Sequence, residues 1–517
     1  MPHLSSNVNK NNGNDHQTHR ALIFQGGGAL GAYEAGVYKA LYDNLIETTI
    51  KEKRQLFDIV AGTSAGAINA TLLVNWVIQN KTQTNPWKGS PEMLCQFWEE
   101  VSTDTGYLEN MFIEHYIRYL SFLRKSFNKI SKATLKEFDR NYAGIRENSA
   151  FLPFYYLWMD MYGNLTTVES FRRYWSSYIL AYSPFGTPNV LSPIIFQPDY
   201  RFMNPFNFML KYDNTPLTKT IGKYWDHMAH PIKTKEGEPR LLLVAVDVQD
   251  ATTVTFDSYV KKHNQMMSIY GDDDKKEKHA ILYRDGIKME HLLTTMSTHL
   301  RYKFPELNVT TITDENAYVV EDKGHPRPFM DGFYLSNTPL REVLQAHRDY
   351  WYKVKGLKEN VHPLDIYIGD LYTAKENGTP KDPDSITNRV QNVLYHDRSK
   401  YDEKVGAMVS DYVNIIRDLI DMVNEKGVSE SDMYDKLNVG LKNKMRSTNR
   451  KGERRNAEDL INGRVTINRI QRIEYGECQH LHDSDDISGK AFDFSKRTIS
   501  HLIDQGYNDT IIKCKFN

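Results

Sequence analysis

The sequence predicts an α/β fold built on a mostly parallel sheet, because one local pattern occurs twice near its start. A short apolar run at residues 21–24 ends in three successive glycines, and apolar side chains then recur at helical spacing over residues 29–45. A second apolar run, at residues 57–61, enters another glycine-containing turn, and residues 67–78 follow as an apolar segment of helical length. A buried strand, a tight turn and a helix in succession are typical of parallel strands joined by crossover helices.

Later segments continue this pattern after a long interruption. Short runs rich in apolar or β-branched side chains predict further strands. They lie at residues 241–248, 252–256, 364–368 and 465–473. Residues 384–423 are typical of long charged helices, and a last helix is expected at residues 494–503. The sequence contains no internal repeat.

An insertion at about residues 81–240 separates the two groups of strands. Apolar side chains recur at helical spacing between residues 108 and 123, and the stretches at 151–158 and 202–209 are dense in aromatic side chains. We therefore expect a helical, aromatic-rich insertion. Aromatic residues at helical spacing usually form core, so contact of the insertion with a lipid surface is the less frequent interpretation.

The chain is expected to divide into three regions. Residues 1–20 are rich in Asn, His, Ser and Thr and lack the apolar segment of a signal peptide, so we expect a disordered tail. Residues 21–375 are expected to form the main domain, with the insertion inside it. Residues 376–517 are expected to form a mainly helical extension that packs on this domain.

Charge and cysteine content argue against several classes of protein. The formal net charge of −1 gives no reason to expect a nucleic-acid partner. Cys95, Cys478 and Cys514 are widely separated, so neither a disulfide framework nor a zinc motif is indicated.

No run of about 18 apolar residues predicts a transmembrane segment. We expect a cytoplasmic protein. Peripheral contact with a membrane is an alternative, because a basic run such as residues 442–455 attracts anionic lipid head groups. Such a run more often forms a solvated loop.

The first motif that carries chemistry is GTSAG at residues 62–66, which matches GxSxG between a predicted strand and a predicted helix. In such a turn the serine is exposed at the helix N-terminus, and Gly62 and Gly66 stand where side chains have no room. The helix amides and dipole favour negative charge on a substrate oxygen. Ser64 is therefore a candidate nucleophile; the alternative is an ordinary glycine-rich turn with an N-cap serine.

The second motif is GGGALG at residues 26–31. Successive glycines expose backbone N–H groups, as an oxyanion hole requires, and Gly26, Gly27 and Gly28 are the candidates. Together with Gly31 they also satisfy the GxGxxG dinucleotide fingerprint. That fingerprint needs an acidic residue at the end of the next strand, where this chain has the serine turn instead. The nucleotide-binding interpretation is therefore much the weaker of the two.

A candidate base lies far downstream, in the sequence Asp331-Gly332-Phe333. The aspartate follows a short apolar stretch and is followed by SNTPL at residues 336–340. Taken alone, Asp331 is better explained as a residue that caps a turn. The case for a base depends on the motifs upstream.

GGGALG, GTSAG and DGF, in this order, resemble the patatin-like phospholipase family. Residues 214–217 (NTPL) add to the resemblance, and residues 492–507 are similar to a C-terminal extension of long prokaryotic members. The resemblance implies a three-layer α/β/α sandwich that hydrolyses lipid esters without a metal or another cofactor. It implies a dyad in which Ser64 is the nucleophile and Asp331 the general base, with an oxyanion hole at the glycine loop.

Two positions depart from the family's pattern. Leu30 stands where many members carry Arg or Lys, and Phe333 stands where Gly or Ala is usual. Neither change removes a reacting group. A bulky residue at position 333 resists unusual backbone angles, and it could crowd the pocket.

The implied reaction is attack of the Ser64 hydroxyl on an ester carbonyl, with Asp331 accepting the proton. Such a carboxylate needs a partly dry site, which raises its pKa. Two alternatives stay open. One is a Ser-His-Asp esterase, whose usual residue order makes His347 or His362 the base. The other is a catalytically weak lipid-binding protein on the same fold.

Overall fold

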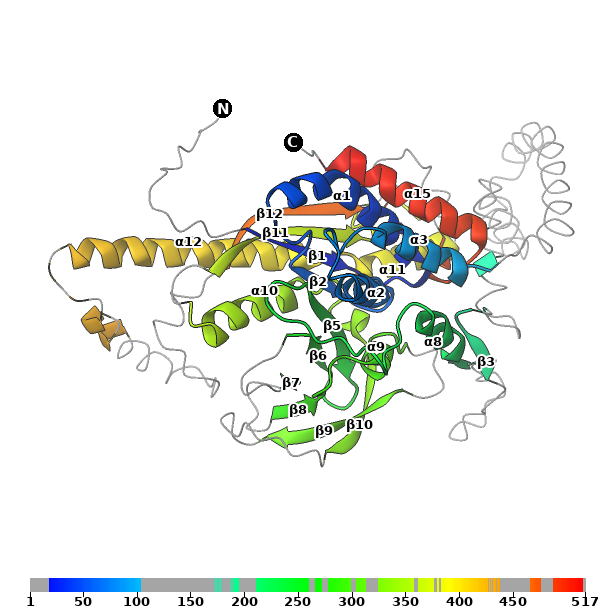
Figure 1. The fold of residues 1–517 in the computed structure, drawn as a ribbon, viewed down its shortest axis with the longest axis horizontal. Coiled ribbons are helices and arrows are strands. Elements are labelled where there is room, and N and C mark those ends of the chain that lie inside the picture. The colour runs from blue at the N-terminus through cyan, green and yellow to red at the C-terminus, as the bar shows by residue number, and fades with distance from the viewer. Residues whose placement is uncertain are drawn as a thin grey trace, which may run out of the picture.

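The structure of the chain is a computed structural model that describes most of the expected main domain and much of the extension (Figure 1). The described residues are 18–103, 173, 176–177, 187, 189–194, 211–259, 266–271, 278–298, 304–312, 324–357, 361–375, 379–380, 383–425, 427, 429, 431–433, 435–437, 465–475 and 487–514. Several expectations lie outside these residues. They concern most of the N-terminal tail, the helical spacing at 108–123, the aromatic stretches at 151–158 and 202–209, and the basic run at 442–455.

The described strands form a mixed sheet of ten strands and a separate two-stranded sheet. The order across the large sheet is β12 (Val465–Glu474), β11 (Val361–Asp370), β1 (His19–Phe24), β2 (Ile59–Gly62), β5 (Arg240–Asp247), β10 (His325–Asp331), β9 (Glu306–Ile312), β8 (Lys278–Leu282) and β7 (Met267–Tyr270), and β6 (Thr252–Asp257) also pairs with β5. From β12 to β5 neighbouring strands are parallel, and the remaining pairs are antiparallel.

Helices cover both faces of the sheet. Those in the described residues are α1 (Gly31–Lys51), α2 (Ala65–Gln79), α3 (Ser90–Val101), α8 (Thr215–Gly222), α9 (Met289–Thr295), α10 (Leu340–Arg348), α11 (Pro383–Tyr395), α12 (Ser399–Asn424) and α15 (Lys496–Lys513), with short helical turns η1 (Gly28–Leu30), η5 (Gly332–Tyr334), η6 (Asp349–Val354) and η8 (Lys490–Phe492). The predicted three-layer α/β/α class is confirmed. None of these helices is both long enough and apolar enough to cross a membrane.

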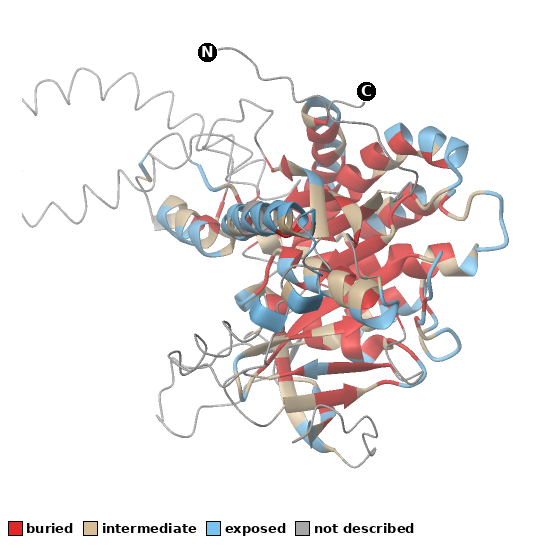
Figure 2. Cartoon of the chain, turned by 90° about the vertical axis from the view of Figure 1, so that its left-hand side faces the viewer, coloured by how far each residue is buried: buried red, intermediate tan, exposed pale blue. Residues whose placement is uncertain are grey.

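Side chains that alternate along β1 divide the core between the two faces. Leu22 and Phe24 belong to a large apolar cluster with side chains of α1, α2, α3 and α15. Ala21 and Ile23 belong to a second cluster that includes Leu340 of α10. Successive side chains of a strand point to opposite faces, so a strand that is apolar at every position needs a covering layer on each side. Figure 2 shows the buried residues running through the sheet, with exposed residues on the outer sides of the helices.

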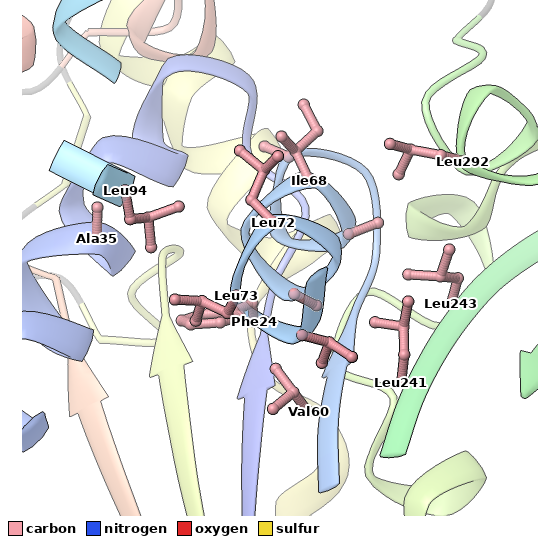
Figure 3. Close-up of a cluster of buried hydrophobic side chains, with 14 of the residues drawn as sticks. Phe24, Ala35, Val60, Ile68, Leu72, Leu73, Leu94, Leu241, Leu243 and Leu292 are labelled. Carbon is pink, nitrogen blue, oxygen red and sulfur yellow. The ribbon is translucent and has the colours of Figure 1, made fainter. Parts of the chain in front are cut away.

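Helix α2 packs against the parallel strands through closely fitted aliphatic side chains (Figure 3). Leu73 of α2 lies beside Phe24 of β1, and Val60 of β2 and Leu241 of β5 belong to the same buried cluster. Complete burial of each such side chain contributes about 1.5–3 kcal/mol. Because α2 begins at the residue after Ser64, this packing fixes the direction in which the serine turn leaves the sheet.

The extension is part of the sheet as well as a cover for it. Strand β12 pairs in parallel with β11, at the edge of the parallel half. Helix α15 lies along α1, and the approach is so close that a Cβ atom on Gly506 would stand 2.0 Å from the carbonyl oxygen of Tyr33. The Tyr33 hydroxyl also donates a hydrogen bond to the Asp509 carboxylate at 3.0 Å. Residues after 375 therefore contribute to the same core as residues before it.

Strand β1 begins two residues before the predicted boundary at residue 21. His19 and Arg20 belong to β1, so the prediction of a disordered tail through residue 20 was wrong at its end. Arg20 is buried although it is charged. Its backbone N–H donates to Asp58 at 2.7 Å, and its guanidinium donates to Thr49 at 2.8 Å. Partners this far away in the sequence cannot be recognised from local composition.

The described part of the insertion contains both helix and strand. Helices α3 and α8 lie near its two ends, and β3 (Ser192–Ile194) pairs antiparallel with β4 (Lys211–Asp213). The NTPL segment at residues 214–217 forms the start of α8. The prediction of helices is thus confirmed at these two positions, and the small sheet is an addition to it.

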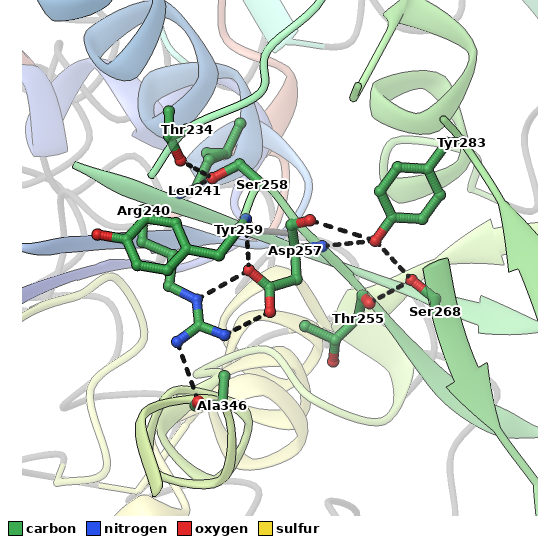
Figure 4. Close-up of polar contacts among 10 residues, drawn as sticks. All are labelled: Thr234, Arg240, Leu241, Thr255, Asp257, Ser258, Tyr259, Ser268, Tyr283 and Ala346. Carbon is green, nitrogen blue, oxygen red and sulfur yellow. Dashed lines mark hydrogen bonds and ion pairs between the residues drawn. The ribbon is translucent and has the colours of Figure 1, made fainter. Parts of the chain in front are cut away.

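A buried ion pair fixes β5 against β6 and α10 (Figure 4). The Arg240 guanidinium forms two hydrogen bonds to the Asp257 carboxylate, at 2.8 and 2.5 Å, and a third to the carbonyl of Ala346 at 2.9 Å. Both charged side chains are about 4% exposed or less. A buried charge of this kind needs all of its partners, because the protein interior solvates it poorly.

We predict that Asp257→Asn lowers the free energy of unfolding by about 3–5 kcal/mol, because it leaves the Arg240 charge buried without its counter-ion. Urea unfolding of the two proteins measures the difference. Asp285→Asn is the matched control, since Asp285 pairs with Lys288 at the surface and should change the midpoint far less. Equal losses in the two variants would contradict this account of β5.

Candidate active site

The GTSAG segment forms the sharp turn that its sequence predicts. Strand β2 ends at Gly62, α2 begins at Ala65, and Ser64 between them has φ 54° and ψ −122°. A positive φ is strained for a residue with a side chain. A Cβ atom on Gly62 would stand 2.2 Å from the carbonyl oxygen of Gly66, and one on Gly66 would stand 2.5 Å from that of Phe24. Both glycines are therefore required by the closeness of the backbones.

The edges of β5 bring Asp331 to the serine turn. Strand β6 pairs with β5 along residues 242–247 and so occupies one edge of it. The other edge is shared: β2 pairs with residues 240–243 in parallel, and β10 pairs with residues 245–247 in the opposite direction. The strands β2 and β10 consequently meet end to end, with Gly62 opposite Leu243 and Asp331 opposite Ala245. Ser64 lies two residues beyond the end of β2, and Asp331 is the last residue of β10.

Burial dominates the electrostatics of Asp331. The residue is fully buried, and removal of the carboxylate from water raises its pKa to about 7. Hydrogen bonding from the Ser64 hydroxyl and from the Phe333 backbone N–H, which donates to Oδ1 at 3.0 Å, acts in the opposite direction. Within the described residues Oδ2 has no hydrogen bond of standard geometry. One carboxylate oxygen of Asp331 is therefore able to accept a further hydrogen bond or a proton.

The glycine loop lies against the serine. A Cβ atom on Gly26 would stand 2.8 Å from Cβ of Ser64, so the loop leaves no space between them. The Gly26 N–H donates to the Asn337 side chain at 2.9 Å and is already satisfied. The N–H groups of Gly27, Gly28 and the residue after the serine, Ala65, donate to no other described residue. Gly28 and Ala65 line the same pocket as Ser64.

Buried polar side chains that the sequence analysis did not single out hold this loop. The Gln25 amide donates to Thr338 at 2.6 Å and accepts from the Leu371 N–H at 2.8 Å. The Gln25 backbone N–H donates to Glu34 at 2.5 Å, and the Asn69 side chain also donates to Glu34, at 3.2 Å. Burial raises the pKa of Glu34, and these two hydrogen bonds act against that rise. A glutamate among the small and hydrophobic residues of the first two turns of α1 is the sequence signal that could have indicated this network.

An apolar pocket opens onto Ser64. It encloses about 720 Å³ of space free of protein atoms, part of it open to solvent. Side chains from four parts of the chain line it: Ile68 of α2, Phe97, Trp98 and Val101 of α3, Leu217 of α8, and Phe492 and Phe494 near the C-terminus. Such walls suit a hydrocarbon chain and exclude water from the serine. Among the described residues, no group of three or more potential metal ligands converges.

The histidines that could complete a triad lie elsewhere. The His347 ring donates through Nε2 to the carbonyl of His362 at 2.8 Å, and the His362 ring stacks on that of His19, with centroids 4.4 Å apart. His19 begins β1, whose opposite end, at Phe24, leads into the glycine loop. The length of β1 thus separates this cluster from Ser64.

Comparison with known proteins identifies the family. A sequence model of the family described as patatin-like phospholipase matches residues 22–344. The chain belongs to the patatin-like phospholipase family. The match contains the glycine loop, the serine turn and Asp331, and membership implies lipid acyl hydrolase activity. Strands β11 and β12 and all residues beyond them lie outside the match.

Other comparisons add little to this patatin-like assignment. No curated protein sequence matches the chain. Among solved structures, the crystal structure of VipD from Legionella pneumophila is similar at 12% identity and a TM-score of 0.24. That similarity covers 78% of this chain and 55% of VipD, so the present chain spans about half the length of VipD.

The two departures from the patatin pattern are accommodated without strain. Leu30 is fully buried, and its Cβ lies near the backbone of Gly27. Phe333 is not among the described residues with positive φ. Its ring packs on those of Tyr334 and Tyr395, with centroids 4.1 and 4.8 Å away. The bulky residue after Asp331-Gly332 therefore needs no unusual backbone angle, and it links the motif to α11.

The closeness of backbones at the serine turn predicts a large cost for Gly62→Ala. The added methyl group would overlap the Gly66 carbonyl, and overpacking of this kind costs about 1–3 kcal/mol. Gly222→Ala is the control, because a Cβ atom at this position, the end of α8, would meet no other atom within 4 Å. That change should leave stability equal or raise it by about 0.5–1 kcal/mol. Denaturant unfolding compares the variants, and a Gly62→Ala protein as stable as Gly222→Ala would contradict the described turn.

Proposed function

We propose that the protein is a serine-dependent lipid acyl hydrolase of the phospholipase A or lysophospholipase type, with Ser64 as nucleophile and Asp331 as general base. The observation that carries the proposal is the position of Asp331: a fully buried carboxylate, with a pKa of about 7, that interacts with the Ser64 hydroxyl. A base with this pKa is ionised for much of the time at neutral pH and still attracts a proton. The strained φ of Ser64 and the apolar pocket support the same assignment.

In the first half of the reaction, the Ser64 oxygen attacks the ester carbonyl carbon and its proton passes to Asp331. The carbonyl oxygen becomes an oxyanion that the N–H groups of Gly27 and Gly28 stabilise, with Ala65 as a further donor. Gly26 has a different part in this proposal, because its N–H is engaged by Asn337. It lets the loop approach the serine. Collapse of the intermediate releases the alcohol, which takes the proton from Asp331.

In the second half, Asp331 accepts a proton from water as the water oxygen attacks the acyl-enzyme. The same amides stabilise the second oxyanion. Collapse then breaks the bond between the acyl carbon and the Ser64 oxygen, and that oxygen recovers the proton. The products are a fatty acid and the free enzyme, so no cofactor is consumed. A histidine is not needed, in agreement with the distance of His347 and His362 from the serine turn.

We predict that Ser64→Ala and Asp331→Asn each reduce hydrolysis of a panel of phospholipid, lysophospholipid and neutral-lipid esters by at least about a thousandfold, because each removes a reacting group. His347→Gln and His362→Gln serve as controls and should keep most of the activity. Circular dichroism checks that all four variants fold. Full activity in Asp331→Asn, or loss of activity in one histidine variant alone, would favour a Ser-His-Asp esterase instead.

The pH dependence of kcat/KM should follow the ionisation of Asp331. The group must be deprotonated to accept the serine proton, so activity is present above a pKa of about 7 and is lost as the pH falls through it. Below that value the rate constant should decrease about tenfold for each pH unit. Initial rates with a soluble ester from about pH 5 to about pH 9 provide the measurement, and a profile that stays flat across this range would exclude Asp331 as the base.

A further inference from the structure

One wall of the pocket above Ser64 is formed by the C-terminal segment of residues 490–494. Ala491, Phe492 and Phe494 line the pocket together with Gly28 and Ser64. These three residues stand about 150 positions after the end of the family match at residue 344. The part of the chain that belongs to the family by sequence therefore leaves the pocket open on this side.

The segment touches the glycine loop through its backbone. Gly28 has φ +56°, and a Cβ atom on it would stand 2.2 Å from the carbonyl oxygen of Ala491 and 3.4 Å from the Ala491 Cβ. No side chain fits between the two loops. A displacement of residues 490–492 would therefore change both the pocket wall and the position of the Gly28 N–H group, which is proposed to stabilise the oxyanion.

A buried lysine anchors the first end of the segment. Lys490 is fully buried, and its ammonium group donates to the Asn392 side chain of α11 at 2.8 Å. The same group lies over the rings of Tyr372 and Tyr475, 5.4 and 5.9 Å from their centroids. An ammonium group in the interior is stable only with such partners, so they fix the direction of the chain at residue 490.

A buried aspartate anchors the other end. Asp493 is fully buried and accepts hydrogen bonds from the hydroxyls of Ser176, Ser495 and Thr498, each at 2.7–2.8 Å. Arg173 forms an ion pair with it at 3.4 Å. The next residue, Phe494, accepts from the Thr103 N–H at 2.8 Å through its carbonyl group. Both ends of the wall are therefore tied to other elements, and the wall is rigid.

We propose that residues 490–494 set the length of the acyl chain accepted at Ser64, with Ala491 and Phe492 as the specificity-determining side chains. This inference rests on the proposed function, because it assumes that the acyl group occupies the pocket. A rigid wall selects acyl groups by length, because it cannot move aside for an acyl group that is too long. Each methylene group that the pocket buries raises kcat/KM about fourfold, and a methylene group that the wall excludes does not contribute this increase.

The test compares kcat/KM for the p-nitrophenyl esters of butanoate, octanoate, dodecanoate and hexadecanoate. Ala491→Leu fills the pocket beside Gly28 and should lower the ratio of dodecanoate to butanoate hydrolysis by at least about tenfold. Phe492→Ala opens the same wall and should raise the ratio for dodecanoate or hexadecanoate over butanoate. Ile512→Ala is the control from the same extension, since Ile512 is 64% exposed on α15 and should leave the profile unchanged.

The outcomes separate the two proposals. Opposite shifts in Ala491→Leu and Phe492→Ala support the assignment of the wall. If the unmodified protein hydrolyses the esters but neither variant changes the profile, or if both lose activity equally on every ester, the chain-length assignment is wrong and the proposed function stands. If the unmodified protein hydrolyses none of the esters or lipids and a fluorophosphonate fails to label Ser64, the proposed function itself fails. Should Ala491→Leu not fold, the direction of the Phe492→Ala shift decides.

Discussion

The arrangement of the site depends on one constraint, the division of the two edges of β5. Because β6 occupies one edge, β2 and β10 must share the other, and they approach from opposite ends. Ser64 and Asp331, separated by more than half of the chain, consequently meet just beyond the point where the two strands stop. The Arg240–Asp257 pair secures β5 against β6, and so it maintains this division from a distance.

The same position explains the chemistry. The Asp331 carboxylate at the end of β10 is shielded from water, and this shielding raises its pKa to about 7, the range that the proposed role as a base requires. Hydrogen bonding from Ser64 and Phe333 opposes this rise in pKa only in part. The glycine loop faces the pair from the side of β1, held by Asn337, Gln25 and Glu34.

Local features of the fold and site could be predicted because local sequence determines them. The turns at GGGALG and GTSAG need glycine for close approach of backbones, and β2, most of β5 and residues 21–24 of β1 are apolar at nearly every position. Asp331 was different. Its sequence surroundings favour a simple turn cap, and only the family resemblance gave it a role. Its burial follows from the pairing of β10 with β5, which no local pattern reveals.

Residues whose partners are far away in the sequence could not be predicted. Asn337 satisfies Gly26, Arg20 pairs with Asp58 and Thr49, and Lys490 reaches Asn392 of α11. Each is a polar residue whose partner no local pattern indicates. The contribution of residues 490–494 to the pocket wall was hidden for the same reason, since nothing in the local sequence places them beside Ser64.

The most direct test of this account is the ionisation of Asp331 itself, followed by carbon-13 NMR of the labelled carboxyl group in the unmodified protein and in Ser64→Ala. We expect titration near pH 7 in the unmodified protein. We expect a higher pKa in Ser64→Ala, because the hydrogen bond that stabilises the charged form is lost. Titration near the ordinary aspartate pKa of about 4, or a pKa that does not change when the Ser64 hydroxyl is removed, would contradict the claim that these two side chains act as a pair.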